Sequence, residues 1–256
     1  MVFLESLNPI LDPLLRPLLA LGAFWTIFII SIAISFASNL AYKFLTNQTL
    51  MKHLKQEVKR MQKELKQLKD KPEEFASLQK KMMAKSMEMT KHSMKPTLFT
   101  MIPILLFFGW LATNLAFMPL MPGVPFDVTL QFAPEARGNV TLNADGLELL
   151  SSKTLALDTP ELMWTLQGEA GRYILEFQHD GKVYEKKILI TEEQSFENPL
   201  EIRKKDSSLK KIEIGNKPLK PLGDFTIFGW RPGWFGLYFI ISVAASLLIR
   251  KLMKLY

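Results

Sequence analysis

Three long runs without a charged side chain do most to constrain what this chain can fold into. They cover residues 17–42, 96–126 and 232–249, which are 26, 31 and 18 positions long in a chain of 256. A helix needs roughly 20 apolar residues to cross the hydrocarbon core of a bilayer. We therefore expect an α-helical membrane protein with three transmembrane helices, at residues 18–42, at residues 96–118 and within residues 230–256.

The charges between and after these runs predict the orientation of the chain. Residues 43–95 hold 14 Lys or Arg against 6 Asp or Glu, and Arg250, Lys251 and Lys254 follow the third run. Loops rich in Lys and Arg stay in the cytoplasm. With three spans, residues 1–17 and 119–229 then lie outside the plasma membrane. Residues 1–17 lack a basic leader and a cleavage site, so we expect a retained, external amphipathic segment rather than a signal peptide.

The basic loop at residues 43–95 has the pattern of a cytoplasmic antiparallel coiled-coil hairpin. Its first half carries apolar residues at alternating spacings of three and four, which is a heptad seam. Pro72 disfavours helix at the residue before it, and Glu73 and Glu74 suit the start of a second helix. Asn47 is suited to cap the first helix. The seam consists of Met51, Leu54, Val58, Met61, Leu65 and Leu68.

The second arm of this hairpin carries more methionine than one seam can use. At about 100° per residue, Met82 and Met89 fall on the stripe that faces the first arm. Met83, Met87 and Met94 lie on a second stripe, roughly 120° away. This stripe packs either on the N-terminal segment or a third helix of the chain, or it binds apolar segments of varied sequence, for which the flexible thioether is suited. The flanking lysines favour contact with anionic lipid or with ribosomal RNA.

Polar side chains in the three predicted spans cluster at one depth, toward the cytoplasm. Such groups are costly in lipid unless they face protein or water. One interpretation is close helix packing through small residues. The other is a shallow hydrated groove that opens to the cytoplasm and receives the polar flanks of a substrate. The candidate groove residues are Ser31, Ser35, Asn39, Thr97, Thr100, Ser242 and Ser246.

The external segment predicts a small β-sandwich-like domain over residues 119–195. Six short stretches within residues 127–190 alternate apolar and polar side chains, as half-buried strands do. Asp180-Gly181 is a strong signal for a two-residue hairpin turn between the last two. Residues 196–229 are expected to form an extended return to the third span. Asn139, followed by Val and Thr, fits a glycosylation acceptor on the exposed side.

No pattern of catalysis or cofactor binding accompanies these elements. The chain has no cysteine and only three histidines, and it has no nucleophile–base pair, glycine-rich phosphate loop or metal-ligand cluster. We therefore expect neither an enzyme nor a cofactor, metal, small-molecule substrate or DNA partner. A receptor or adhesion protein that acts through its external domain is the alternative, although a hairpin that folds back and a short C-terminal tail do not suit signal transmission. A small-ion channel would need intramembrane charges, which the runs lack.

The order of these segments resembles a known superfamily. A basic hairpin is followed by KPTLFTMIPILLFFGWLATNLAF (95–117) and then by FGWRPGWFGLYFIISVAASLLIRKL (228–252). This arrangement resembles the archaeal branch of the Oxa/YidC-type membrane insertases, with the third subunit of the endoplasmic-reticulum membrane protein complex as a more distant relative. The resemblance implies a three-helix core that helps nascent membrane-protein segments enter the bilayer. In contrast to the bacterial members, the nearby basic residues Lys43, Lys95 and Arg250 lie at the rim of the spans rather than deep within them.

Overall fold

The computed structural model describes residues 8–68, 70–203 and 208–255. The chain divides into two compact units, one formed by Met1–Trp110 with Phe235–Tyr256 and the other by Leu111–Trp234. Parts of four predicted segments lie outside the described residues: 1–7 of the N-terminal segment, 69 of the hairpin, 204–207 of the return segment and 256 of the tail.

Among the described residues, three helices are long and apolar enough to span a membrane, as the sequence predicts. They are α3 (Ala23–Leu45), α5 (Pro72–Leu115) and α6 (Trp234–Leu252). The first begins five residues later than predicted, because residues 18–22 belong to a preceding helix and to a turn. The coarse fold, three apolar helices with a separate antiparallel β domain, is therefore confirmed.

The predicted N-terminal amphipathic segment forms a short helix of its own, α2 (Asn8–Leu19). Gly22, at a φ of 87°, lies between this helix and α3, in a backbone conformation that favours glycine. Thr26 joins the two helices, because its buried hydroxyl donates to the carbonyl oxygen of Leu18 at 2.7 Å. Asp12 attaches α2 to α5 as well, because its carboxylate accepts a 2.8 Å hydrogen bond from the indole nitrogen of the fully buried Trp110.

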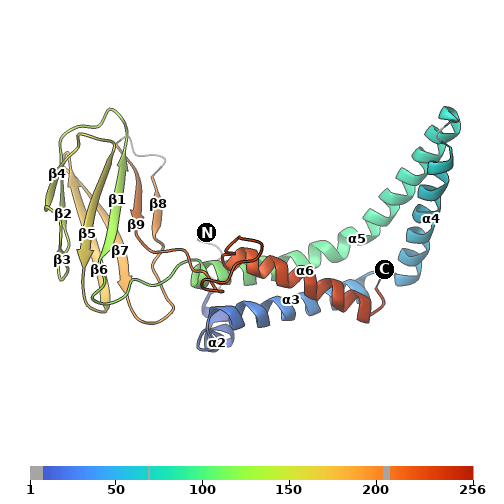
Figure 1. Ribbon diagram of the computed structural model, residues 1–256, viewed down its shortest axis with the longest axis horizontal. Helices are drawn as coiled ribbons and strands as arrows, with labels where there is room; N and C mark the ends of the chain where they lie inside the picture. The colour runs from blue at the N-terminus through green and yellow to red at the C-terminus, as the bar shows by residue number, and fades with distance from the viewer. Residues whose placement is uncertain (1–7, 69, 204–207, 256) are drawn as a thin grey trace. The chain divides into compact units, whose positions relative to one another are not determined.

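The hairpin consists of α4 (Gln48–Gln67) and the first half of α5, which lie side by side in Figure 1. Asn47 caps α4 as predicted, since its side-chain oxygen accepts a 3.0 Å hydrogen bond from the backbone N–H of Leu50. Lys85 joins the arms by contacting Glu57 of α4 at 3.4 Å and Glu88 of its own helix at 3.3 Å. The coiled-coil geometry of the pairing stays a prediction.

The second hairpin arm and the second span form one helix rather than two elements. The 44 residues of α5 run without interruption through Pro96 and Pro103, and the helix bends along its length in Figure 1. Each proline removes one N–H donor and weakens the helix locally. The second hairpin arm and the apolar span therefore belong to one helix, and the methionine stripes of the arm lie on that helix too.

In the described part of the β domain, the six predicted strands are joined by three others. They form a five-stranded sheet in the order β3-β5-β1-β9-β8 and a four-stranded sheet in the order β4-β2-β6-β7, with antiparallel pairing throughout. Asp180 and Gly181 form the predicted turn between β6 and β7, both at positive φ. The strands are β1 (Phe126–Phe132), β2 (Asn139–Asn143), β3 (Glu148–Leu149), β4 (Thr154–Ala156), β5 (Glu161–Gln167), β6 (Gly171–His179), β7 (Lys182–Ile190), β8 (Leu200–Ile202) and β9 (Leu209–Ile214).

The structure corrects the predicted end of this domain at residue 195. Part of the expected extended return, residues 196–229, forms β8 and β9, and β9 pairs with β1 from Val128 to Phe132. The physical reason is burial: Leu209, Ile212 and Ile214 belong to the core cluster, and the two residues between Leu209 and Ile212 coincide with a shift in the pairing register with β1. The β domain therefore continues at least to Ile214.

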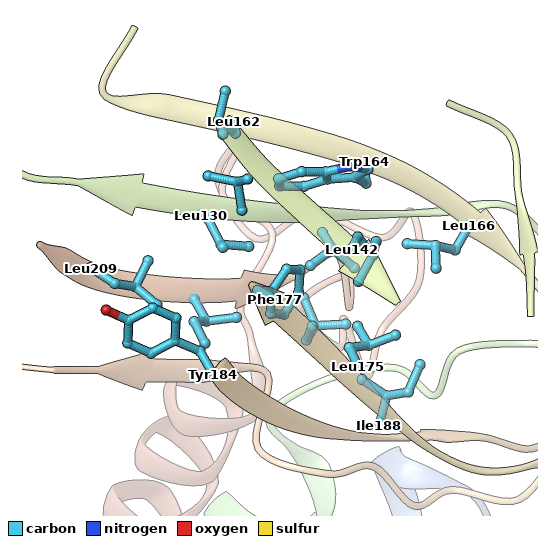
Figure 2. Close-up of a cluster of buried hydrophobic side chains, with 14 of the residues drawn as sticks. Leu130, Leu142, Leu162, Trp164, Leu166, Leu175, Phe177, Tyr184, Ile188 and Leu209 are labelled. Atoms are coloured by element: carbon cyan, nitrogen blue, oxygen red, sulfur yellow. The ribbon is translucent and has the colours of Figure 1, made fainter. Parts of the chain in front are cut away.

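One cluster of buried side chains draws on both sheets (Figure 2). Trp164 and Leu130 come from the five-stranded sheet, and Phe177 and Leu175 from the four-stranded sheet; all four are fully buried. The rings of Trp164 and Phe177 approach to 5.8 Å between centroids. This shared core stabilises the domain, while its detailed sandwich geometry stays a prediction.

Candidate functional site

Helical spacing predicts that the second methionine stripe lies on one face of α5 but leaves open whether another helix covers that face; in the described part of the chain the stripe is exposed. Met83, Met87 and Met94 expose 59%, 59% and 53% of their surface. Met82 and Met89, on the stripe that faces α4, are half-buried. Exposed methionines in a row form an apolar surface that can adapt its shape to a partner. The hairpin therefore carries an exposed methionine stripe, defined here as Met83, Met87 and Met94.

Four of the seven predicted groove residues instead join α3 to α6. Ser35 donates to the carbonyl oxygen of Ser242 at 3.2 Å, and Asn39 donates to the hydroxyl of Ser246 at 3.1 Å and to the carbonyl oxygen of Ser35 at 2.7 Å. Ser35 and Asn39 are each only 5% exposed. These residues form a closed polar seam between two helices, which is the packing interpretation rather than the groove.

The other three predicted groove residues lie on two helices: Ser31 is on the buried face of α3, and Thr97 and Thr100 are on α5. Ser31 is fully buried, and its hydroxyl has no hydrogen-bond partner among the described residues. Thr97 is exposed and donates to the carbonyl oxygen of Ser93, one turn earlier in α5. Thr100 donates to the carbonyl oxygen of Thr97. The prediction that all seven residues line one groove is therefore wrong: Ser35, Asn39 and Ser246 use their side chains between α3 and α6, Ser242 contributes its carbonyl oxygen there, and Thr97 and Thr100 bond within α5.

A hollow lies between α3 and α5 and consists of two neighbouring pockets. The pocket at the end of α3 has a volume of about 610 Å³ and is lined by Leu45, Lys91, Met94, Lys95, Leu98 and Phe99. The pocket farther along the helices has a volume of about 330 Å³ and is lined by Ala33, Ile34, Ala37, Ser38, Ala41, Phe99, Thr100, Pro103 and Phe107. Both pockets share Phe99. Thr100 is the one predicted groove residue on their walls.

The α3–α5 hollow, as we name these two pockets, is continuous with the methionine stripe. Met94 belongs to the stripe and also lines the first pocket. The walls are mainly apolar, with Lys91 and Lys95 on the first pocket and Ser38 and Thr100 on the second. An apolar segment could therefore follow one helix, α5, from the exposed stripe into the hollow.

Sequence reasoning missed most of this hollow, although a signal for it is present. Ala33, Ala37 and Ala41 recur every four residues on one face of α3. Such a row of small side chains leaves space when the facing helix does not approach closely. Opposite it, α5 contributes Phe99, Pro103 and Phe107 to the walls. The row alone would not have distinguished a hollow from tight helix packing, because small residues permit both.

The fold and this site define the protein as an integral membrane protein with a hairpin and a hollow built on its spanning helices. A family model described as Integral membrane protein EMC3/TMCO1-like matches residues 8–149, which is more than half of the chain. The chain therefore belongs to the EMC3/TMCO1-like family, which is part of the Oxa1/YidC/Alb3 insertase superfamily. No curated protein and no solved structure matches it. The archaeal affiliation stays a prediction.

Proposed function

We propose that this protein is a non-enzymatic insertase that guides apolar segments of nascent membrane proteins into the bilayer. The observation that carries the proposal is the continuity of the exposed methionine stripe with the α3–α5 hollow through Met94. Membership of a family within an insertase superfamily supports the same function. In this proposal the hairpin and the C-terminus face the cytoplasm of a plasma membrane, and the β domain faces outward.

The methionine stripe would make the first contact with a substrate. Exposure to water costs an apolar segment about 25 cal/mol for each Å² of its apolar surface. Met83 and Met87 offer a flexible apolar surface that fits different sequences without demanding one shape. The lysine-rich surroundings keep the hairpin soluble, and contact with a ribosome or with anionic lipid would hold it close to its substrates.

The α3–α5 hollow would receive the segment next. Its apolar walls replace water around the segment, and Lys91, Lys95, Ser38 and Thr100 provide polar contacts for the flanking residues. Burying unpaired polar groups is the main cost of insertion, whereas the apolar core of the segment favours the bilayer by itself. The closed seam of Ser35, Asn39, Ser242 and Ser246 serves in this scheme as the support that holds α3 and α6 together.

A reconstitution assay tests the role of the stripe. The triple substitution Met83→Ser, Met87→Ser and Met94→Ser should lower the yield of a weakly hydrophobic single-span substrate several-fold in proteoliposomes. The matched control carries Met118→Ser, Met121→Ser and Met163→Ser, three methionines that are also at least 42% exposed but lie outside the stripe. Equal yields from the two triple variants would refute capture by the stripe.

The same assay tests the hollow. Ala37→Trp fills space between α3 and α5, whereas Phe36→Trp places the same ring at a position that is 51% exposed on α3 and outside both pockets. Insertion should fall with the first substitution and persist with the second. Photocrosslinkers at Met87 and Phe99 should both label nascent chains, and labelling of lipid alone would contradict the proposed path.

A further inference from the structure

A tight turn of exposed aromatic residues precedes α6. In residues 225–230, the aromatic turn, the backbone N–H groups and carbonyl oxygens of Ile227 and Trp230 bond each other at 2.8 and 3.0 Å. Phe228 and Gly229 are the two central residues, at φ values of 51° and 80°. Positive φ at both central positions is the geometry of a two-residue hairpin turn.

A phenylalanine is an unusual residue at the first central position of such a turn. The left-handed region favours Gly, Asn and Asp, and a bulky side chain there is strained. The turn between β6 and β7 in the same chain uses Asp180 and Gly181 at nearly the same angles. Strain of this kind often accompanies function when the side chain itself serves a purpose.

The side chain of Phe228, at this strained position, is fully exposed. Phe228 is 104% exposed, and Phe225 and Trp230 on either side are 65% and 52% exposed. None of the three belongs to the buried core of the β domain. Exposed apolar groups that cluster in this way mark an interaction surface rather than a folding contact.

The base of the turn carries charge instead of apolar surface. Arg231 contacts Asp224 at 3.2 Å, and Lys220 donates to the carbonyl oxygen of Arg231 at 3.3 Å. The segment thus has an aromatic tip and a charged base. This arrangement matches the membrane interface, where aromatic rings lie at the headgroup level and basic groups remain among the headgroups.

Chain connectivity identifies the bilayer as the partner. Trp230 precedes Trp234, the first residue of the spanning helix α6, by four positions, and even fully extended chain covers only about 14 Å over that distance. We propose that the aromatic turn inserts Phe225, Phe228 and Trp230 into the lipid interface at which α6 begins, and so anchors this end of the helix. The proposal is independent of insertase activity, because it needs lipid but no substrate.

Fluorescence labelling can test this directly, because the chain has no cysteine of its own. Full-length Phe228→Cys would carry an environment-sensitive dye in vesicles of phosphatidylcholine and phosphatidylglycerol. Val183→Cys, at an edge-strand position that is 56% exposed, is the aqueous control, and Phe239→Cys, 58% exposed on α6, is the lipid control. We expect the dye at position 228 to be blue-shifted, quenched by lipids with brominated acyl chains and several-fold less accessible to iodide than the dye at position 183.

A second labelled variant, Phe225→Cys, keeps the Phe228 ring in place and serves as the background for removing it. The dye at Phe225→Cys should show the same lipid quenching, and adding Phe228→Gly should raise its iodide quenching several-fold, since glycine accepts the turn geometry but removes the ring. Iodide access at position 228 equal to that at position 183 would overturn the proposal. Protection from both iodide and brominated lipid would also overturn it, because protein rather than lipid would then cover the turn.

Discussion

At the scale of single residues, Lys186 is the least expected feature of the β domain. It lies on the buried face of the edge strand β7, with its side chain 8% exposed, and reaches Glu201 on the edge strand of the other sheet at 3.6 Å. Burial lowers the pKa of Lys186 below its ordinary value of 10.5, and Glu201 opposes that shift. An inward-pointing charge on an edge strand also discourages pairing with another chain.

Substitutions at this pair should separate the cost of burying charge from the benefit of pairing it. Glu201→Gln should lower the free energy of unfolding of the β domain by about 2 kcal/mol, because it removes the carboxylate that pairs with the buried Lys186 ammonium and, at 2.7 Å, with Arg203. Lys186→Met should be neutral or stabilising. Hydrogen exchange of the β7 amides measures both effects. Glu213→Gln, which affects a carboxylate that is 51% exposed, is the control and should change little.

The pH dependence of the same measurement follows from the direction of the pKa shift. Because the pKa of Lys186 is lowered in the folded state, the unfolded chain binds more protons as the pH approaches 10.5. The cost of the buried charge is thus fully present at neutral pH and is relieved at alkaline pH. As the pH rises toward 10.5, loss of the proton from folded Lys186 should increase the free energy of unfolding. Lys186→Met should abolish this increase. An identical alkaline profile in both proteins would contradict this account.

At the scale of elements, the polar seam explains why α3 and α6 pair. The buried face of α3 includes Ser31, Ser35 and Asn39 at helical spacing, and small side chains allow the backbones to approach. Arg250 lies over the Tyr42 ring at 4.9 Å and adds a contact between the same two helices. The seam therefore specifies the partner of α3 and leaves the α5 side of that helix free for the hollow.

A double-mutant cycle should measure this pairing. The coupling between Asn39→Ala and Ser246→Ala should be about 0.6 kcal/mol, the usual size for such hydrogen bonds in membranes. Unfolding in mixed micelles supplies the free energies. Asn39→Ala combined with Thr90→Ala, an exposed hairpin residue, is the control and should be additive. Additivity of the seam pair as well would refute the proposed interaction.

At the scale of the whole molecule, the two compact units should respond separately to core mutations. Leu130 is fully buried in the β domain, and Leu130→Ala should cost that domain about 3 kcal/mol. Hydrogen exchange should show faster opening in β1 and β5 and unchanged protection in α3 and α4. Met163→Ala, at a 56% exposed position of β5, should have little effect on either unit. Loss of protection in α3 with Leu130→Ala would show that the two units unfold together.

The sequence predicted the elements well where their signals are local. The three apolar runs, the Asn47 cap and the Asp180-Gly181 turn all depend on residues within one helix or one hairpin. Helical spacing likewise predicted that Met83, Met87 and Met94 share one face, whereas the exposure of that face came only from the structure. The strand β9 was missed because its lysines mask a short alternating pattern, and because its pairing with β1 joins residues about 80 positions apart.

The sequence by itself determined which side chains occur at each depth of the spans and on each face of the hairpin. Only the tertiary structure decided which helices those side chains face. Ser35 and Asn39 meet Ser242 and Ser246 across the α3–α6 seam, while the row of small residues at Ala33, Ala37 and Ala41 faces a hollow beside α5. The physical reason is that a helix sets the angle and height of its own side chains by a local repeat, whereas its neighbours are chosen by packing among all the helices at once.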